Sequence, residues 1–350
     1  QLRGRIEGFA ENVPGLVFAM VIAFISFLVW SAYKPVSTLM WSFIIGIVIS
    51  NTTNITEKLK PGLRYASSQL LKLTIAVLGL VTSASVWLEV GLGVVNALVI
   101  IVFSYAASIL LGKRLGLSSR LAILIGVGTS ICGASAIAAT APAINAKEEE
   151  IGVALSGITL FGLISMFLYP YLFSNTVVNQ WLLGSPTVYA VWVGSGVHES
   201  AQVIAAAIAL DASCMQPAMI IKSIRIFMIA PVVLASTFYL SRAEGTNGAK
   251  AKVTIPLFAV AFLVNSLLCA ALDASSFTFL GIGWNLAKTA LKSSLIPFLL
   301  AISFAGVGTK VQFKDIASVG WKPFVFAAAM AIVAGTLALA MAVVTAPYLA

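Results

Sequence analysis

A short stretch of the sequence, Gly126–Pro142, gathers hydroxyl, thiol and glycine residues inside an otherwise apolar region. Glycine and proline form helices poorly and unpaired backbone groups are costly in lipid, so this segment is expected to be buried in protein and to line a cavity. A helix that breaks near Ser130–Gly133 and restarts at Ala134 presents free N–H groups, which favour a bound anion. Alternatively, the small residues only let two helices pack closely. The candidate substrate-binding residues here are Thr129, Ser130, Cys132, Gly133 and Ser135.

A second polar cluster contains the single histidine of the chain, His198, beside Glu199, and Gly194 and Gly196 just before them permit a local break in the helix. Helical spacing places Gln202 on the same face as His198, so Gln202 is expected to contribute to substrate binding. The two ionisable side chains are costly to insert into an apolar segment, and both can change protonation, so we expect this pair to carry a coupled proton. The alternative is a pair that merely cross-links helices. A metal site is not expected, because the sequence has no second histidine and no cysteine at ligand spacing.

Two basic residues, Lys222 and Arg225, lie three positions apart within another apolar segment and therefore on one helical face. Buried cations need counter-charges, and Glu199 together with a bound anion would supply them. Both are therefore predicted to bind substrate. The alternative is that structural partners, such as Glu199 and Asp211, neutralise the two cations completely.

The composition of the whole chain indicates an integral membrane protein. Of the 350 residues, 60% are apolar and only 9% are charged, and the mean hydropathy is +1.03. Too few polar residues remain to cover a water-facing surface, which excludes soluble enzymes, nucleic-acid-binding modules and disordered tails. The net charge of +9 is then a property of loops between spans. The three cysteines are widely separated and are expected to be buried free thiols, and no cofactor is implied.

Eleven segments are long and apolar enough to cross a hydrocarbon core of about 30 Å. The predicted fold is therefore all-α and polytopic, with about 11 transmembrane helices, inverted repeats and broken core helices. The predicted spans are residues 14–32, 37–50, 67–86, 92–111, 121–144, 151–173, 187–210, 216–240, 254–272, 286–305 and 323–345.

Loop charges give the expected orientation. With eleven spans, fourteen Lys and Arg residues fall on one side of the membrane, and only Lys34 and Lys147 fall on the other. Because Lys and Arg are enriched in cytoplasmic loops, we expect the N-terminus to be cytoplasmic and the C-terminus to lie outside. A hydrophilic linker at 241–253 is expected on the cytoplasmic side, between the first eight spans in 1–240 and the last three in 254–350. Lys288 and Lys292 are expected to anchor the outer end of the tenth span.

Internal similarity suggests two halves of opposite orientation, which is typical of transporters. Gly79–Gly91 resembles Gly306–Gly320, and the predicted spans that contain these two segments run in opposite directions. The polar segments 128–132 and 194–198 can also be aligned. In an eleven-span topology, however, they would lie on spans that run in the same direction, which an inverted repeat does not allow.

The motifs above, taken together, resemble those of the bacterial sulfate exporter family of YeiH-like polytopic membrane proteins. The resemblance covers most of the chain from about Lys72, and it implies an inner-membrane carrier distantly similar to the bile-acid and sodium/proton antiporter superfamily. The family motif has Asn where Ala134 stands and Asp where Glu199 stands. The matching motifs are Gly128-Thr-Ser-Ile-Cys-Gly-Ala-Ser, Leu160-Phe-Gly, Leu168-Tyr-Pro, His198-x-x-x-Gln-Val and Lys222-x-x-Arg.

The sequence and the resemblance together predict a secondary transporter, an exporter of small anions such as sulfate or related sulfur oxyanions and sulfonates, that works by alternating access in the bacterial inner membrane. The nearest alternative is a cation/proton antiporter of related fold. An intramembrane enzyme using Ser130, His198 and Glu199 is a more distant one, and no enzyme activity is expected. The expected partners are a small anion and the lipid bilayer, and not nucleic acid. A homodimer is compatible with the sequence, which leaves the oligomeric state open.

Overall fold

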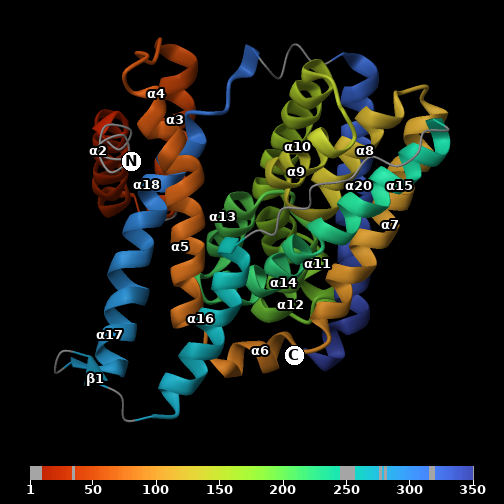
Figure 1. The fold of residues 1–350 in the computed structure, drawn as a ribbon. Helices are drawn as coiled ribbons and strands as arrows, with labels where there is room; N and C mark the ends of the chain where they lie inside the picture. Colours follow the sequence, from red (N-terminus) through yellow and green to blue (C-terminus); the bar gives the residue numbers. More distant parts are fainter. Residues whose placement is uncertain are drawn as a thin grey trace. The chain divides into compact units, whose positions relative to one another are not determined.

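The computed structural model describes residues 10–33, 36–244, 257–275, 278–279, 282–314 and 320–349, almost entirely as helices (Figure 1). The loop charges predicted at Arg3, Arg5, Lys34, Lys250 and Lys252, and most of the linker predicted at 241–253, lie outside these residues. The chain folds into two compact units, and each contains two separate stretches of sequence. Residues 254–350, which the sequence analysis grouped together, are divided between the two units.

The first unit contains residues 1–84 and 258–313. Two of its long helices each contain a five-residue π-helical turn, Ala66–Leu70 and Leu291–Leu295, upstream of the aligned glycines Gly79 and Gly306. This shared irregularity supports the internal repeat inferred from those glycines. The helices and strands are α2 (Val13–Ala32), α3 (Thr38–Thr52), α4 (Lys60–Tyr65), α5 (Leu71–Leu78), α16 (Leu257–Asp273), β1 (Thr278–Phe279), β2 (Ile282–Gly283), α17 (Trp284–Ala290) and α18 (Ile296–Gly308).

Close helix packing in the first unit depends on glycine. At Gly46 on α3, a Cβ atom would lie 2.6 Å from the carbonyl oxygen of Ala305 and 3.0 Å from the Cα of Gly308, both on α18. The two helices therefore touch backbone to backbone, as small residues allow in membrane proteins.

The second unit contains residues 85–257 and 314–350 and holds every predicted site residue. Long helices surround several short ones, and the short helices carry the polar segments of the sequence (Figure 1). Its helices are α6 (Ala84–Val90), α7 (Gly93–Arg114), α8 (Ser119–Val127), α9 (Ala134–Ala143), α10 (Glu148–Asn175), α11 (Val178–Trp181), α12 (Pro186–Gly196), α13 (Ser200–Leu210), α14 (Met215–Phe227), α15 (Ile229–Glu244) and α20 (Trp321–Thr345).

The segment predicted as a single span at 121–144 is instead a helical hairpin made of α8 and α9. Arg120 Nε, at the start of α8, donates to the carbonyl oxygen of Ile144, just after α9, at 3.0 Å. The Ser118 hydroxyl likewise donates to Glu150 Oε1 at 2.5 Å. Since a continuous helix of this length would separate its ends by about 35 Å, these contacts show that the chain returns to the end from which it came.

The segment predicted as a span at 187–210 is a second hairpin, made of α12 and α13. The Tyr189 hydroxyl near the start of α12 donates to the carbonyl oxygen of Ala206 near the end of α13, at 2.8 Å. Cys214 Sγ lies 3.5 Å from the carbonyl oxygen of Pro186. In Figure 1 the open ends of the two hairpins lie toward opposite ends of the unit, with α8 and α9 near the top and α12 near the bottom.

The all-helical, polytopic character predicted from the sequence is confirmed, whereas the count of eleven spans is not confirmed, because the segments at 121–144 and 187–210 are hairpins. Among the described residues, six helical segments are long and apolar enough to cross a membrane, and a seventh is possible as a bent pair. Length and hydropathy could not separate a hairpin from a span, because both contain enough apolar residues. The six segments are Val13–Ala32, Gly93–Arg114, Glu148–Asn175, Ala212–Arg242, Trp284–Gly308 and Trp321–Tyr348.

Candidate functional site

The first hairpin turns where the sequence predicted a break. After α8 the backbone forms a π-helical turn, Gly128–Cys132, and then Gly133 adopts φ +67° and ψ −124° before α9 begins at Ala134. A Cβ atom at Gly133 would lie 2.4 Å from Glu199 Cγ on the second hairpin. Gly133 is therefore required both for its left-handed backbone and for the close approach of the two tips.

The second hairpin turns at residues 197–199, between α12 and α13. Glu199 is the N-cap of α13, and its backbone N–H donates to Gln202 Oε1 at 3.0 Å in a capping box. Gln202 Nε2 donates in turn to the carbonyl oxygen of Thr159 on α10 at 3.3 Å. The Gln202 amide thus fixes the start of α13 to α10, while His198 is completely buried at the turn.

Arg225 on α14 connects the two tips. Its guanidinium is fully buried and donates to carbonyl oxygens of both hairpins. In the first hairpin, Nε donates to Ser130 at 3.0 Å and Nη2 donates to Thr129 at 2.6 Å. In the second, Nη1 donates to Gly194 and to Val197, each at 3.0 Å. These acceptors lie where each first helix ends, and such carbonyls have no partner within their own helix.

Lys222, one helical turn before Arg225, is also fully buried. Its ammonium group donates to the carbonyl oxygen of Val197 at 2.9 Å and to that of His198. We refer to the backbone acceptors of Lys222 and Arg225 together as the tip carbonyls, and their residues are Thr129, Ser130, Gly194, Val197 and His198.

Several polar atoms at the tips have no hydrogen-bond partner among the residues that the structure describes. They are the hydroxyl oxygens of Thr129 and Ser130 and both ring nitrogens of His198. All three side chains are fully buried. Since buried polar groups are almost always paired, these atoms are available to a ligand or to water.

The start of α9 is the more open part of the site. Ala134 is exposed and Ser135 is half-buried, whereas Cys132 and Gly133 are buried. The N-terminus of α9 has no side-chain cap, in contrast to α13, which begins at the Glu199 carboxylate. The first N–H groups of α9 and the Ser135 side chain therefore lie together beside partly accessible space.

Asp211, considered above as a counter-charge for Lys222 and Arg225, lies away from the tips in the described structure. It is exposed, at the end of α13, and accepts a hydrogen bond from the Ser213 backbone N–H at 2.7 Å. Hydrogen bonds from Ser213 hold the pKa of the Asp211 carboxyl below its ordinary value.

An aromatic pair that sequence reasoning did not single out supports the second tip. Tyr169 on α10 stacks on Trp192 of α12, with ring centroids 4.2 Å apart and the rings nearly parallel. The Tyr169 hydroxyl also lies against Gly196, where a Cβ atom would be 2.8 Å away. The Leu-Tyr-Pro motif around Tyr169 was the available signal, but it gave no indication of this role.

The other basic pair of the sequence belongs to the first unit. Lys288 forms an ion pair with Asp273 at 2.6 Å, and Trp284 Nε1 donates to the same carboxylate at 2.8 Å. Lys292 is exposed on the adjoining π-helical turn. No group of three or more His, Cys, Asp or Glu side chains among the described residues could hold a metal ion.

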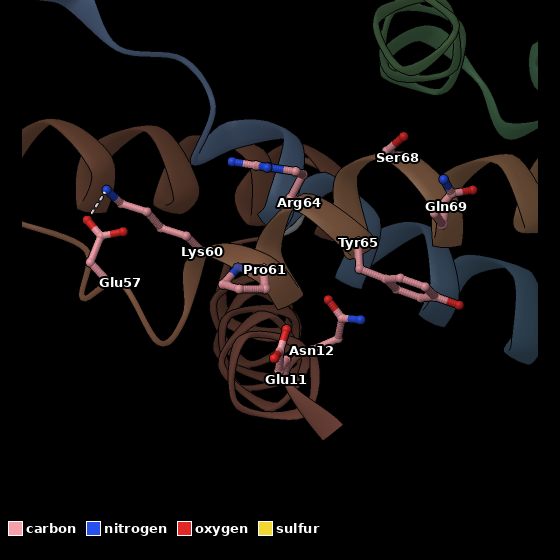
Figure 2. Close-up of a pocket in the computed structure, with 9 residues that line it drawn as sticks. All are labelled: Glu11, Asn12, Glu57, Lys60, Pro61, Arg64, Tyr65, Ser68 and Gln69. Carbon is pink, nitrogen blue, oxygen red and sulfur yellow. Dashed lines mark hydrogen bonds and ion pairs between the residues drawn. The ribbon is translucent and has the colours of Figure 1, made fainter. Parts of the chain in front are cut away.

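A separate polar cavity of about 550 Å³ lies in the first unit, where the beginnings of α2 and α4 meet (Figure 2). Lys60 and Glu57 form an exposed ion pair at its rim, 2.5 Å apart. Two acidic and two basic side chains line this cavity, so its field has no single sign. Its lining residues are Glu11, Asn12, Glu57, Lys60, Pro61, Arg64, Tyr65, Ser68 and Gln69.

Fold and site together define a polytopic membrane protein in which two opposed helical hairpins meet tip to tip around buried basic side chains. The chain belongs to the family described as Conserved hypothetical protein 698, whose sequence profile matches residues 14–327.

Curated relatives match over nearly their full length. The UPF0324 membrane protein plu2856 of Photorhabdus laumondii is 32% identical over 90% of this chain and 88% of its own. The UPF0324 inner membrane protein YeiH of Escherichia coli K12 is 30% identical over 90% of this chain and 89% of its own. The UPF0324 membrane protein PA5383 of Pseudomonas aeruginosa is 32% identical over the same shares.

Proposed function

We propose that this protein is a secondary carrier that exports small anions across the bacterial inner membrane by alternating access. The main observation is the meeting of two opposed, broken hairpins around two buried cations, Lys222 and Arg225. Interrupted helices whose ends meet inside the membrane are typical binding sites of secondary carriers. The names of YeiH and its relatives as inner membrane proteins support the location.

The charge of the site favours an anion. Each break contributes one helix C-terminus and one helix N-terminus, with partial charges of about −0.5 and +0.5 that cancel. Lys222 and Arg225 then contribute two positive charges and Glu199 one negative charge, which leaves a net charge of about +1. Because charges interact strongly in a water-poor interior, this site favours an anion over a cation as its ligand.

The proposed position of the anion is the uncapped start of α9. Backbone N–H groups and the Ser135 hydroxyl can donate hydrogen bonds there, and the buried hydroxyls of Thr129 and Ser130 belong to the preceding turn. Such a donor set suits an oxyanion with several acceptor oxygens. Sulfate, related sulfur oxyanions and sulfonates fit this description, and the resemblance to the sulfate exporter family is the reason for preferring them.

His198 and Glu199 are the proposed proton-coupling pair. Both are at the second tip, and the His198 ring nitrogens have no partner among the described residues. Glu199 lies against Gly133 of the first tip, so a change in its protonation would alter the electrostatic environment of both hairpins.

Transport by purified protein in liposomes tests the proposed function. Vesicles are loaded with radiolabelled sulfate, sulfite, thiosulfate or methanesulfonate, and release is compared with that of protein-free vesicles. We expect release of at least one of these anions, with competition by the unlabelled compound. Absence of anion flux combined with a cation-driven pH change inside the vesicles would instead establish a cation/proton antiporter.

A further inference from the structure

The tip carbonyls form a site of the kind that usually holds a metal cation. They are main-chain oxygens at the ends of two helices, and they converge on two positive groups. In carriers with interrupted helices, unwound carbonyls and helix C-termini commonly coordinate monovalent cations. Here the positive charges are Lys222 and Arg225, both covalently attached to α14.

We propose that the Lys222 ammonium permanently occupies the position of a coordinated monovalent cation, so that the carrier neither binds nor moves Na⁺ or K⁺ at its hairpin tips. That the protein is a carrier rests on the proposed function, whereas the role of Lys222 rests on its hydrogen bonds. Its Nζ atom donates to two carbonyl oxygens at the end of α12, those of Val197 and His198. Lys222 is thereby assigned as a positioning residue.

The Lys222 ammonium group and an alkali cation are physically similar at this position. An ammonium group and an alkali cation each bring a single positive charge to a cluster of carbonyl oxygens, and each removes the cost of leaving those oxygens unpaired. The difference is that the ammonium group is tethered. A free cation can be taken up on one side of the membrane and released on the other, whereas Lys222 cannot leave, so no ion gradient can be coupled through this position.

Arg225 completes the arrangement by bonding carbonyls of both tips, which keeps the two hairpins together without a shared ion. A planar guanidinium reaches several acceptors from fixed directions, which a spherical cation or a single ammonium group cannot do. Arg225 is therefore expected to hold the tips together even when Lys222 is removed.

The first test measures cation binding by Lys222→Ala in detergent. Its thermal unfolding midpoint is followed against methylammonium, Na⁺ and K⁺ chlorides, with choline chloride keeping the ionic strength constant. We expect a saturable rise of roughly 5 °C or more with at least one cation at about a hundred times its Kd. Wild type should show no such rise, and neither should Lys113→Ala, which removes an exposed lysine of the same unit. Lys222→Met, which keeps an unbranched apolar side chain without the charge, is titrated in the same way.

Two results would overturn the proposal. One is a pair of folded Lys222 variants that none of these cations stabilises. The other is a wild-type anion flux that is lost when choline replaces Na⁺ and K⁺, and this second measurement decides the matter even if neither variant can be purified. Equal wild-type flux in all three salts supports the proposal. If no anion is transported in any salt, the proposed function fails, while cation binding by the Lys222 variants still tests the role of this residue.

Discussion

Replacement of Arg225 by alanine removes the side chain that joins the two hairpin tips. The carbonyl oxygens of Thr129, Ser130 and Gly194 lose the donor that Arg225 provides, whereas that of Val197 still accepts from Lys222. An unpaired buried polar group costs about 1–3 kcal/mol, so even at the low end the loss is about 3 kcal/mol. This is a large fraction of a typical total stability of about 5–15 kcal/mol.

Arg225→Lys should be intermediate. It keeps the positive charge, but its three N–H groups radiate from one nitrogen and cannot reach carbonyls of both hairpins as the guanidinium fork does. A control is Arg120→Ala at the open end of the first hairpin, where Nε donates to the carbonyl oxygen of Ile144, away from the tips. We expect the loss of this bond to cost about 1 kcal/mol.

The assay combines thermal unfolding in detergent with the rate at which a maleimide labels Cys132. Cys132 is buried beside the first tip, and Cys214→Ser and Cys269→Ser remove the other two thiols. Opening of the tips should raise the labelling rate about tenfold for each 1.4 kcal/mol lost from the local opening free energy. The reasoning is refuted if Arg225→Ala unfolds no earlier than Arg120→Ala and labels no faster.

Three further outcomes are expected. Gly133→Ala should lower the unfolding midpoint, because its φ is +67° and its Cβ would lie 2.4 Å from Glu199 Cγ, whereas Gly152→Ala, inside α10 with open space around it, should not lower the midpoint. His198→Gln and Glu199→Gln should each flatten the dependence of anion flux on pH, measured between about 5.5 and 8.5, and unaltered profiles in both would exclude this pair as the proton carrier. Ala146→Cys should be labelled from the cytoplasmic side, since the first hairpin returns to its starting end. Labelling from outside would instead show that residues 121–144 cross the membrane as a single span.

The position of both breaks could be predicted from local sequence. Glycine next to hydroxyl residues indicated a break before Ala134, and α9 begins at that residue. Gly194 and Gly196 indicated flexibility in the second segment, and α12 ends at Gly196. Such breaks can be predicted locally, because the helix propensity of a segment depends on the residues of that segment.

The reversal of the chain at each break could not be read from hydropathy. A stretch of about twenty apolar residues crosses the membrane once or enters and returns, and the composition is the same in both cases. The unresolved alignment of segments 128–132 and 194–198 was the missed signal. With hairpins in place of spans the two segments approach from opposite ends, as an inverted repeat requires. Lys147 then joins the side on which the other loop cations are expected, which strengthens the charge bias.

The partners of Lys222 and Arg225 were also missed, for a different reason. Counter-charges were sought among acidic side chains such as Asp211, which the structure places elsewhere. A broken helix, however, always leaves carbonyl groups without partners at its end. Two predicted breaks and two buried cations in one sequence were therefore enough to suggest that the cations bind backbone oxygens.

The lengths of the hairpins have an electrical consequence. The return helices α9 and α13 contain 10 and 11 residues, or about 15–17 Å, which is about half of a hydrocarbon core of about 30 Å. If the proposed anion binds at the tips, a singly charged one would have crossed about half of the membrane voltage, which is worth about 1.2 kcal/mol per 100 mV. Its apparent affinity should change about sevenfold for every 100 mV, in opposite directions for entry from the two faces.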